Sequence, residues 1–500
     1  MNIATDISTT ADQKIEHFDV LIVGAGISGI DAAYHLQKDC PQKTFTLVDS
    51  QETFGGTWST HKYPGIRSDS DLFTFGYKWK PWMGAPIATA EEILKYLDEC
   101  LDENDIRRHI QFQREVKTAS WSSEDKCWTV ELFCKDTGEV QHLSCNFLWM
   151  CQGYYRHSEG YTPDFKGMDQ FKGDIIHPQT WPEDLDYNDK KVVVIGSGAT
   201  AATLIPAMAK DCAHITMLQR SPTYFFAAPN RNEVADMLRA LEVPDEWTHE
   251  IARRKVLSDQ KLITHRSFND SDALRNELIM GAKQYLGEDF DVEAHFTPTY
   301  RPWRQRLAYV PDGDLFRAIK SGDASVVTDQ IDSFTEKGIL LKSGDELEAD
   351  IIVTATGFNM SALGDVAFSI DGEQYDFSKS WAHRGILFSG LPNMAWVFGY
   401  LRTSWTMRSN LVADFVSRLL NHMDDKGASV VTPRLRKEDE DMPELPFVDP
   451  ENFNAGYLMR HMHIMPKQGD RQPWVFSQDY YSEKDEIPAA DLEDGTLEYK

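Results

Sequence analysis

The sequence has few cysteines, and none of them are paired in a redox or metal-binding motif. Its seven cysteines are scattered over 500 residues, and no two of them form a C-x-x-C pair. An odd number of cysteines without a disulfide framework is typical of free thiols in a reducing compartment. The cysteine pattern therefore predicts a cytoplasmic protein.

Positive charge is also scarce. The chain has 51 lysines and arginines against 79 aspartates and glutamates, which gives a formal net charge of −28. A protein that binds a phosphate backbone needs a basic surface, so the composition argues against a nucleic-acid partner. The excess acid is concentrated in residues 437–444 and in the last twenty residues. We expect both stretches to be solvated, flexible surface.

Long hydrophobic runs are missing as well. Residues 1–17 are polar and lack the apolar core of a signal peptide. The most apolar later stretch, residues 385–401, is interrupted by Pro392, Asn393 and several glycines, which argues against a transmembrane helix. We therefore expect a soluble, cytoplasmic protein without a transmembrane segment, and peripheral contact with a membrane stays open.

The most informative feature that is present is a glycine-rich turn near the N-terminus. Residues 18–36, FDVLIVGAGISGIDAAYHL, read as a buried strand, a tight turn and a helix. Gly24 and Gly26 would let backbone amides meet a pyrophosphate, and Gly29 would let helix and strand pack closely. The next strand ends in Asp49, which suits hydrogen bonds to a ribose. This arrangement predicts a site for a dinucleotide with a free ribose, such as FAD.

A second unit repeats this plan. Residues 191–209 again read as strand, turn and helix. The fixed positions of the second turn are Gly196, Gly198 and Ala201. The strand that follows ends in Gln219 and Arg220, where the first unit has an acid. A carboxylate would repel a 2′-phosphate and an arginine can pair with one, so this unit predicts NADPH. The alternative is that Arg220 is an ordinary solvated charge at a strand end.

The order of these segments predicts an α/β fold with two Rossmann-like dinucleotide-binding domains, for FAD and NADP, and a helical insertion in the NADP domain. Residues 147–155 read as a strand that leaves the first sheet, and residues 345–359 as a strand that returns to it. Residues 230–295 have helical periodicity and no glycine fingerprint. The expected parts are FAD domain 1–150, NADP domain 151–222, helical insertion 223–299, NADP domain 300–349, and FAD domain with an acidic C-terminal tail 350–500.

The segment between the two glycine turns, residues 171–182, reads FKGDIIHPQTWP. Alone, it could be a surface loop that is held by two aromatic side chains, Phe171 and Trp181. It matches the pattern F-x-G-x-x-x-H-x-x-x-W-P at every fixed position, and in this it resembles the Baeyer–Villiger monooxygenases. In that family the segment links the FAD and NADP domains. The resemblance implies that His177 helps to coordinate movement of the nicotinamide and performs no acid–base chemistry.

The resemblance extends over nearly the full chain and is closest to the ethionamide-activating monooxygenases and to related flavin monooxygenases of long-chain alkane use. The characteristic segments are residues 55–71, 220–224, 302–319 and 354–359. The resemblance implies FAD contacts by Ser28, Thr57, Trp58, Asp69 and Val116, with Arg67 in the same cofactor-facing loop. It implies NADP contacts by Ser197 and Thr200 of the second glycine turn, besides Gln219 and Arg220.

The resemblance also implies a catalytic pair. Arg306 matches the active-site arginine of the family, and Asp69 matches its acidic partner. The position before this arginine is often lysine in the family but is Gln305 here, and Arg304 stands where this branch often has aspartate. The departure leaves open which residues complete the site for the 2′-phosphate.

The chemistry that the resemblance implies is oxygen insertion. NADPH reduces FAD, the reduced flavin captures O2 as a C4a-peroxide, and the deprotonated peroxide attacks a ketone to give an ester or a lactone. The partners are then O2 and a small-molecule ketone or sulfide, with thioamides and sulfides oxidised at sulfur. A heteroatom monooxygenase with little ketone activity is the main alternative, and a non-catalytic flavin-binding module is a third.

Two further possibilities have less support. A flavin disulfide reductase needs two cysteines shortly after the first glycine turn, but no cysteine lies between Cys40 and Cys100, and Trp58 stands in this region. His461 and His463 alternate as some metal ligands do. Two histidines without further ligands fall short of the usual four, so we expect surface residues and no metal site there.

Overall fold

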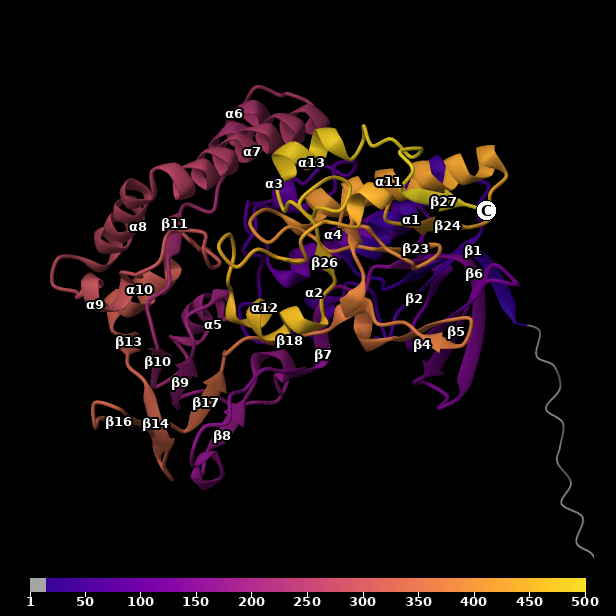
Figure 1. Ribbon diagram of the computed structural model, residues 1–500. Coiled ribbons are helices and arrows are strands. Elements are labelled where there is room, and N and C mark those ends of the chain that lie inside the picture. Colours follow the sequence, from indigo (N-terminus) through magenta and orange to yellow (C-terminus); the bar gives the residue numbers. More distant parts are fainter. Residues whose placement is uncertain (1–14) are drawn as a thin grey trace, which may run out of the picture.

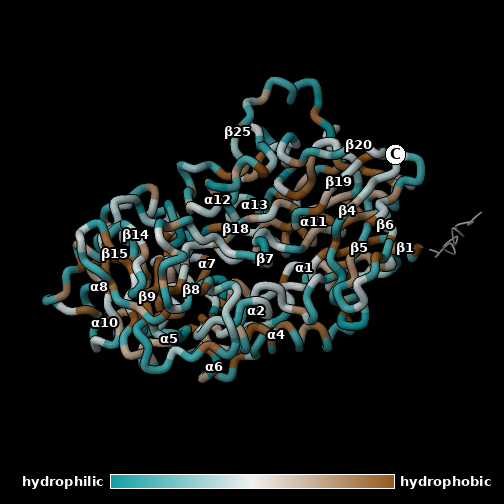
Figure 2. The backbone as a smooth tube through the Cα atoms, turned by 90° about the horizontal axis from the view of Figure 1, so that it is seen from below, coloured by the Kyte–Doolittle hydropathy of each residue, from teal (hydrophilic) through white to brown (hydrophobic). Residues whose placement is uncertain are grey.

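The computed structural model describes residues 15–500, so the prediction of no signal peptide in residues 1–17 lies almost wholly outside the described residues. Two α/β units lie side by side, each built on its own sheet (Figure 1). The two end portions of the chain, indigo and orange to yellow in Figure 1, together form one unit, and the middle forms the other. Hydrophobic segments concentrate in the strands of both sheets (Figure 2). Within residues 15–500, no helix is long and apolar enough to cross a membrane.

The first unit is a nine-stranded sheet in the order β20-β19-β4-β5-β6-β1-β2-β3, with β23 paired to β6. Its strands are β1 (Glu16–Val23), β2 (Phe45–Val48), β3 (Ile110–Gln111), β4 (Arg114–Ser122), β5 (Cys127–Cys134), β6 (Val140–Met150), β19 (Ala367–Ile370), β20 (Glu373–Gln374) and β23 (Met394–Trp396). The apolar run that predicted the first strand forms β1, and β1 is parallel to both β2 and β6. The second half of β1 is fully buried, which suits a strand that has a neighbouring strand on both sides.

Three helices cover one face of the first sheet. They are α1 (Ile27–Asp39), α4 (Ala90–Glu103) and α11 (Trp405–Lys426), and their apolar side chains share one core with alternate residues of β1. The other face packs on a second apolar cluster from the later part of the chain. A capping box at Thr89 and Glu92 fixes the start of α4. This layering places the start of α1 at the edge of the sheet where the parallel strands end.

The second unit is a five-stranded parallel sheet in the order β13-β10-β9-β17-β8. Its strands are β8 (Asp174–Ile176), β9 (Lys191–Ile195), β10 (His214–Gln219), β13 (Ala324–Thr328) and β17 (Ile351–Thr354). Two helices, α5 (Ala199–Met208) and α10 (Asp314–Ser321), pack in its core. Small strands lie beside it: β11 (Phe225–Ala228) with β12 (Ala308–Pro311), and β14 (Ile331–Phe334), β15 (Gly338–Leu341) and β16 (Glu346–Glu348).

The position of β17 contradicts the prediction of where the chain returns to the first sheet. Residues 345–359 were expected to return the chain to the first sheet, with a boundary at residue 350, but Ile351 pairs with Val192 of β9 in the second sheet. A short apolar strand carries no local signal for the sheet that it joins, because burial on both faces is the same in either place. The chain returns only after residue 354, through β18 (Phe358–Met360), which pairs with the outgoing strand β7 (Tyr155–Gly160).

The predicted helical insertion is present, although residues 225–228 at its start form the strand β11. Its helices are α6 (Glu233–Ala240), α7 (Asp245–Asn269), α8 (Ser271–Leu286) and α9 (Val292–Phe296). The long helix α7 also packs on the first unit, because the guanidinium of Arg253 is buried there and donates to the carbonyl oxygens of Phe73 and Gly76 at 2.9 and 3.1 Å. The insertion therefore joins the two units.

The C-terminal part of the chain is not the flexible acidic tail that was expected. Residues 480–486 form α13 (Tyr480–Glu486), and β27 (Leu497–Tyr499) pairs with β24 (Val431–Pro433). Glu483 is 4% exposed and pairs with fully buried Arg408 at 2.6 Å. Asp439, within the other acidic run, is fully buried and accepts hydrogen bonds from Arg436 and Trp474. Acidic runs were read as solvated because carboxylates are seldom buried, but arginine partners compensate these two.

Candidate active site

The first glycine turn connects β1 to α1 and has a backbone that requires glycine. Gly24 has a φ of +107°, and a Cβ atom added there would lie 2.7 Å from the carbonyl oxygen of Cys151. A Cβ atom on Gly29 would lie 1.9 Å from the carbonyl oxygen of Gly24, which is the close helix–strand packing predicted for this position. A Cβ atom on Gly26 would lie 3.5 Å from Gly56 Cα in the following turn, and both glycines line the cavity. The amides at the start of α1 are therefore accessible to a phosphate.

Asp49 stands at the end of β2, beside this turn. Its Oδ2 accepts a hydrogen bond from the amide of Ala25 at 2.7 Å, and its Oδ1 accepts one from the amide of Gln51 at 2.8 Å. Burial raises the pKa of the Asp49 carboxyl, and the two amides oppose that rise. The nearby hydroxyl of Ser28, on α1, accepts a hydrogen bond from the indole of Trp405 on α11 at 2.7 Å. The two helices are thus tied together beside the first turn.

The second glycine turn connects β9 to α5 in the same way. Gly196 has a φ of +125°, and a Cβ atom there would lie 2.3 Å from the carbonyl oxygen of Ala355. A Cβ atom on Gly198 would meet nothing within 4 Å, so this side of the turn is open. The hydroxyls of Ser197 and Thr223 lie 2.8 Å apart behind it. The second turn therefore offers the start of α5 to a phosphate as the first offers the start of α1.

The two residues at the end of β10 differ in their environment. The side chain of Gln219 is buried, and its amide donates to the carbonyl oxygen of His295 at 2.7 Å and to the hydroxyl of Thr328 at 2.9 Å. Arg220 is exposed and lies on the wall of the open space. Arg220 is therefore free to reach an anion beside the second turn, whereas Gln219 is held in the fold.

A single cavity of about 1380 Å³ extends between the two glycine turns. Most of the residues that the sequence predicted for the site lie on its wall: Gly24, Gly26, Ser28, Asp49, Thr57, Trp58, Asp69, Val116, Gly196, Ser197, Gly198, Thr200, Gln219, Arg220 and Arg306. They come from both units, so the cavity brings together segments that are far apart in the sequence. Its size and its two glycine turns fit two dinucleotides.

Four of the predicted residues do not lie on the cavity wall: Gly29, Arg67, His177 and Ala201. Gly29 and Ala201 are the packing positions of the two turns, where helix and strand meet. Arg67 was expected to face the cofactor, but its guanidinium pairs with Asp314 of α10 at 2.5 Å. Arg67 therefore forms an ion pair with the first residue of α10, and this pair connects the two units.

Arg306 and Asp69 form a bidentate ion pair on the cavity wall. The Nε and Nη2 atoms of Arg306 donate to the two carboxylate oxygens of Asp69, each at 2.7 Å. Nη1 donates to the carbonyl oxygen of Leu401 at 2.8 Å, and Nη2 also donates to the hydroxyl of Ser70 at 3.0 Å. Burial would lower the pKa of the guanidinium, but the charge and hydrogen bonds of Asp69 raise it. Arg306 is therefore a fixed and permanently charged cation.

Three tyrosines beside this pair were not predicted from the sequence. Tyr154, Tyr155 and Tyr457 all line the cavity, and the Tyr154 hydroxyl donates to that of Tyr155 at 2.9 Å. Burial raises the pKa of all three well above the ordinary value, so they are neutral hydrogen-bonding groups at physiological pH. Tyr154 and Tyr155 follow the strand β6, and residues at such strand ends line α/β sites, which is a signal that could have found them. Tyr457, on α12 (Gly456–His461), has no such signal.

His177 lies where the chain crosses between the units. Its Nε2 donates to the carbonyl oxygen of Gly357, on the returning segment, at 3.0 Å, and its Nδ1 accepts from the amide of Gln179 at 3.1 Å. The ring also packs against Gly160 of the outgoing strand, where a Cβ atom would lie 1.9 Å from Cε1. Burial lowers the pKa of His177, so the ring is neutral. His177 thus contacts both connections between the units and is not itself part of the cavity wall.

The two histidines considered as metal ligands are not close to other such groups. His461 donates from Nδ1 to the carbonyl oxygen of Tyr457 at 2.8 Å, and His463 is exposed. Across residues 15–500, one group of three side chains could hold a metal ion, and it lies elsewhere, on α1 and α11.

Comparison with known proteins agrees with this geometry. Residues 22–81 match the NAD(P)-binding Rossmann-like domain family, and residues 86–237 match the flavin-binding monooxygenase-like family. The FAD-containing monooxygenase EthA of Mycobacterium tuberculosis is 45% identical over 486 residues, which cover 97% of this chain and 98% of EthA. The chain belongs to the FAD-containing monooxygenases. This monooxygenase is also 44% identical to AlmA of Acinetobacter baylyi, a probable FAD-binding monooxygenase. The match covers 97% of this chain and 96% of AlmA.

Solved structures confirm the predicted fold class. An oxidized steroid monooxygenase bound to NADP matches this monooxygenase with a TM-score of 0.70 and 24% identity, over 85% of this chain and 88% of the other. A cyclohexanone-bound cyclohexanone monooxygenase matches with a TM-score of 0.68 and 21% identity, over 85% and 90%. The two-domain dinucleotide-binding architecture of this monooxygenase is therefore that of the Baeyer–Villiger monooxygenases.

Proposed function

We propose that this monooxygenase uses FAD and NADPH to insert one oxygen atom of O2 beside a ketone carbonyl, which yields an ester or a lactone. The observation that carries the proposal is the Arg306–Asp69 pair on the wall of a cavity that two glycine turns share. Seven free cysteines support a reducing, cytoplasmic setting.

The first glycine turn would hold FAD. Its pyrophosphate would lie at the start of α1, where Gly26 and Gly56 line the cavity without side chains, and Asp49 would accept hydrogen bonds from its ribose. Thr57, Trp58 and Val116, which line the same part of the wall, would surround the rest of the molecule. When bound and reduced, FAD supplies the oxygen-transfer chemistry, and the protein positions it and provides charge.

The second glycine turn would hold NADPH. Arg220 is exposed beside this turn and carries no side-chain hydrogen bond within the described residues, so its guanidinium can take the 2′-phosphate in a bidentate manner. Gln305 also lies on the wall, whereas Arg304 pairs with Glu451 at 3.1 Å and is held away from this task. Arg220 is thus the principal ligand that we propose for the 2′-phosphate.

Arg306 would stabilise negative charge on oxygen during insertion. Attack on a ketone produces an oxyanion, and a fixed donor aimed at such a charge is worth about 2.7–4 kcal/mol. The bidentate bond to Asp69 and the bond to Leu401 hold the guanidinium in one orientation, so no reorganisation is needed when the charge develops. The neutral hydroxyls of Tyr154 and Tyr155 can add hydrogen bonds without adding a competing negative charge.

Oxidation of sulfides and thioamides at sulfur is a second candidate. It is supported by the resemblance of residues 55–71, 220–224, 302–319 and 354–359 to the ethionamide-activating monooxygenases, which implies oxidation at sulfur. The two reactions place different demands on the residues around the cavity. Sulfur is the nucleophile in its own oxidation, and no carbonyl oxyanion forms, so Arg306 should matter less for it than for ketone oxidation.

One experiment separates these functions. The purified enzyme is given NADPH, O2 and either a linear ketone, a cyclic ketone, a sulfide or a thioamide, and NADPH oxidation is followed while products are identified by mass. Ketone-stimulated NADPH oxidation that yields esters or lactones supports the first proposal. Sulfoxides without esters support the second, and NADPH oxidation that no substrate stimulates argues for a flavin-binding module without this activity.

A further inference from the structure

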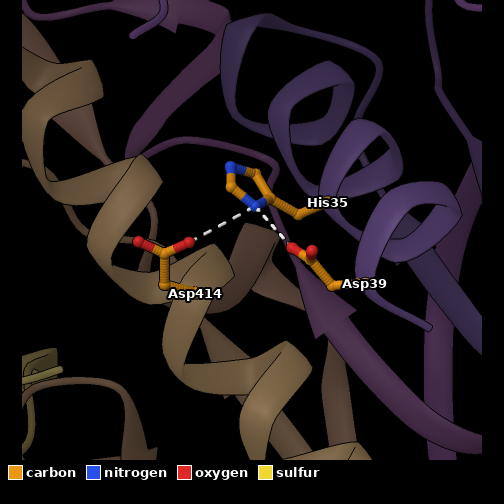
Figure 3. A group of neighbouring side chains, drawn as sticks. All are labelled: His35, Asp39 and Asp414. Carbon is orange, nitrogen blue, oxygen red and sulfur yellow. Dashed lines mark hydrogen bonds and ion pairs between the residues drawn. The ribbon is translucent and has the colours of Figure 1, made fainter. Parts of the chain in front are cut away.

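One imidazole on α1 lies among three carboxylates, away from the cavity. His35 Nδ1 lies 3.2 Å from Asp39 Oδ2, one turn further along α1, and 3.4 Å from Asp414 Oδ1 on the neighbouring helix α11 (Figure 3). The other ring nitrogen, Nε2, faces Asp31 Oδ1 at 3.7 Å. In the described part of the chain, the ion pairs of Asp39 and Asp414 are with His35 alone. One imidazole, even when protonated, cannot balance the charges of both Asp39 and Asp414.

The spacing of these atoms is that of ligands around a metal ion. The three ligand atoms of His35, Asp39 and Asp414 all lie within 4.8 Å of one another. Two ligands that are each ~2.0–2.1 Å from a tetrahedral ion lie about 3.3 Å apart. The two separations from His35 Nδ1, 3.2 and 3.4 Å, bracket this value. A cation bound between the imidazole nitrogen and either carboxylate oxygen would therefore need little movement of these side chains.

Asp31, which faces the other ring nitrogen of His35, has the position of a carboxylate that supports a metal-binding histidine. His35 is 6% exposed, and its Nε2 has no hydrogen-bond partner although it is buried. It points toward Asp31, which is fully buried and is fixed by Trp79 at 3.0 Å and Asn410 at 3.2 Å. A histidine that binds a metal through one nitrogen commonly directs its other N–H to a carboxylate. Asp31 stands in the place of that carboxylate.

We propose that His35, Asp39 and Asp414 form a binding site for a borderline divalent metal ion, with Zn²⁺ as the best match. One imidazole nitrogen and two carboxylate oxygens suit Zn²⁺, whereas Mg²⁺ and Ca²⁺ prefer ligand sets of oxygen alone. The Asp39 and Asp414 side chains are 34% and 49% exposed, which provides an entry path and leaves room for water as a fourth ligand.

An ion at this site would join two helices that frame the first glycine turn. α1 begins directly after Gly26, and α11 begins with Trp405, whose indole bonds the Ser28 hydroxyl on α1. His35 and Asp414 lie further along the same two helices, so the ion would add a further connection between them. The expected effect is structural stabilisation. It does not depend on which substrate the enzyme oxidises.

The test uses the full-length, tag-free holoenzyme after treatment with EDTA. Zinc content is measured after equilibration with ZnCl2 and removal of free ion, binding is followed by calorimetry, and Tm is recorded with ZnCl2 or MgCl2. We expect one zinc per chain and a rise in Tm that grows with ZnCl2 concentration, with no such rise in MgCl2. Asp414→Asn, at a half-exposed position, should weaken zinc binding at least about tenfold and shift the Tm rise to correspondingly higher ZnCl2 concentration.

Two controls make the result decisive. His463→Gln removes an exposed histidine elsewhere and should keep the wild-type zinc content and Tm response. Flavin absorbance confirms that each variant is folded, and Asp39→Asn provides a second ligand variant if one of them fails to fold. Equal zinc binding by wild type and by both folded aspartate variants would overturn the proposal. Absence of zinc binding by the wild type would also overturn it and would leave the group as a histidine–carboxylate ion pair only.

Discussion

Arg306 and Asp69 share two hydrogen bonds of 2.7 Å across 237 positions of the chain. Asp69 lies in the loop between α2 (Thr57–Thr60) and α3 (Leu72–Phe75) of the first unit, and Arg306 lies just before β12 beside the second. The pair therefore forms only when both units are in place. The cation is thus fixed at this junction, on the wall of the cavity between the two glycine turns.

Arg306→Ala should abolish most ester formation and leave flavin reduction largely intact. Loss of one preorganised donor costs about 10²–10³ in turnover, and the loss should fall on the step at which the oxyanion develops. NADPH would still be oxidised, but its electrons would emerge as hydrogen peroxide. Stopped-flow absorbance measures flavin reduction, product analysis counts esters, and a peroxidase assay measures peroxide.

The control for that experiment is Arg306→Lys. A lysine keeps the charge but cannot reproduce the planar pair of bonds to Asp69, so we expect poor rescue. Asp69→Ala should act in the same direction but more mildly, because Asp69 orients the cation and does not replace it. Near-normal ester yield in Arg306→Ala would show that the catalytic cation is a different residue.

Arg220→Ala should raise the KM for NADPH by about tenfold or more and leave the KM for NADH nearly unchanged. A hydrogen bond between charged groups is worth about 1.5–3 kcal/mol, and only NADPH carries the 2′-phosphate. Steady-state kinetics with both cofactors measure this directly, and NADH serves as the internal control. If both KM values rise together, Arg220 is not the ligand of the 2′-phosphate.

His177→Ala should uncouple NADPH oxidation from oxygenation without loss of FAD. The neutral ring bonds the Gly357 carbonyl and packs on Gly160, so its removal frees the two connections between the units. His177 lies away from the cavity wall, so flavin content should not change. The measured quantities are bound FAD per chain and peroxide formed per NADPH. Wild-type coupling in a folded variant would assign His177 a purely structural role.

The two glycine turns could be predicted because their causes are local. Gly24 and Gly196 each combine a positive φ with a backbone oxygen less than 3 Å from where a Cβ would lie, and such constraints leave a short, readable pattern. Arg306 carries no local signal of catalysis. Only the family resemblance indicates its role, because the contact with Asp69 depends on the packing of both units.

Other features depend on long-range contacts that composition and periodicity do not encode. The apolar sequence of residues 351–354 predicts a buried strand but does not indicate which sheet it joins. Its pairing with β8 and β9 places it in the second unit. Tyr457 reaches the cavity from a short helix some 300 positions after Tyr154. Acidic residues near the C-terminus were read as solvated because the sequence does not show that an arginine in α11 is buried nearby.

His249→Gln should make stability less sensitive to acid. Burial lowers the pKa of His249 to about 4, with the nearby Arg253 cation acting in the same direction. The unfolded chain takes up a proton near pH 6.5 that the native state does not, so this histidine costs ~1.4 kcal/mol per pH unit as the pH falls from about 6.5 toward 4. Glutamine does not titrate. The Tm of the variant relative to wild type should therefore rise between pH 7 and pH 5.

Melting curves at several pH values provide the measurement for His249. Glutamine can still accept from the amide of Trp82, which His249 Nδ1 binds at 3.0 Å, so the loss at neutral pH should be modest. His463→Gln changes an exposed histidine and should keep the wild-type pH dependence. A Tm difference between His249→Gln and wild type that stays constant over this range would contradict the lowered pKa.

Glu483→Gln should destabilise the enzyme, although Glu483 lies in a segment rich in surface acids. Its Oε2 accepts from the fully buried guanidinium of Arg408 at 2.6 Å and from the hydroxyl of Tyr400 at 2.6 Å, and its Oε1 accepts from Ser477 at 2.9 Å. Glutamine would leave Arg408 as a buried charge without a counter-charge. Such a change costs about 3–5 kcal/mol, which should appear as a clear fall in Tm. Asp485→Asn, on the exposed side of the same helix, removes an equal charge and should leave Tm nearly unchanged. If the two variants melt at the same temperature, the buried pair does not hold the C-terminal segment on the first unit.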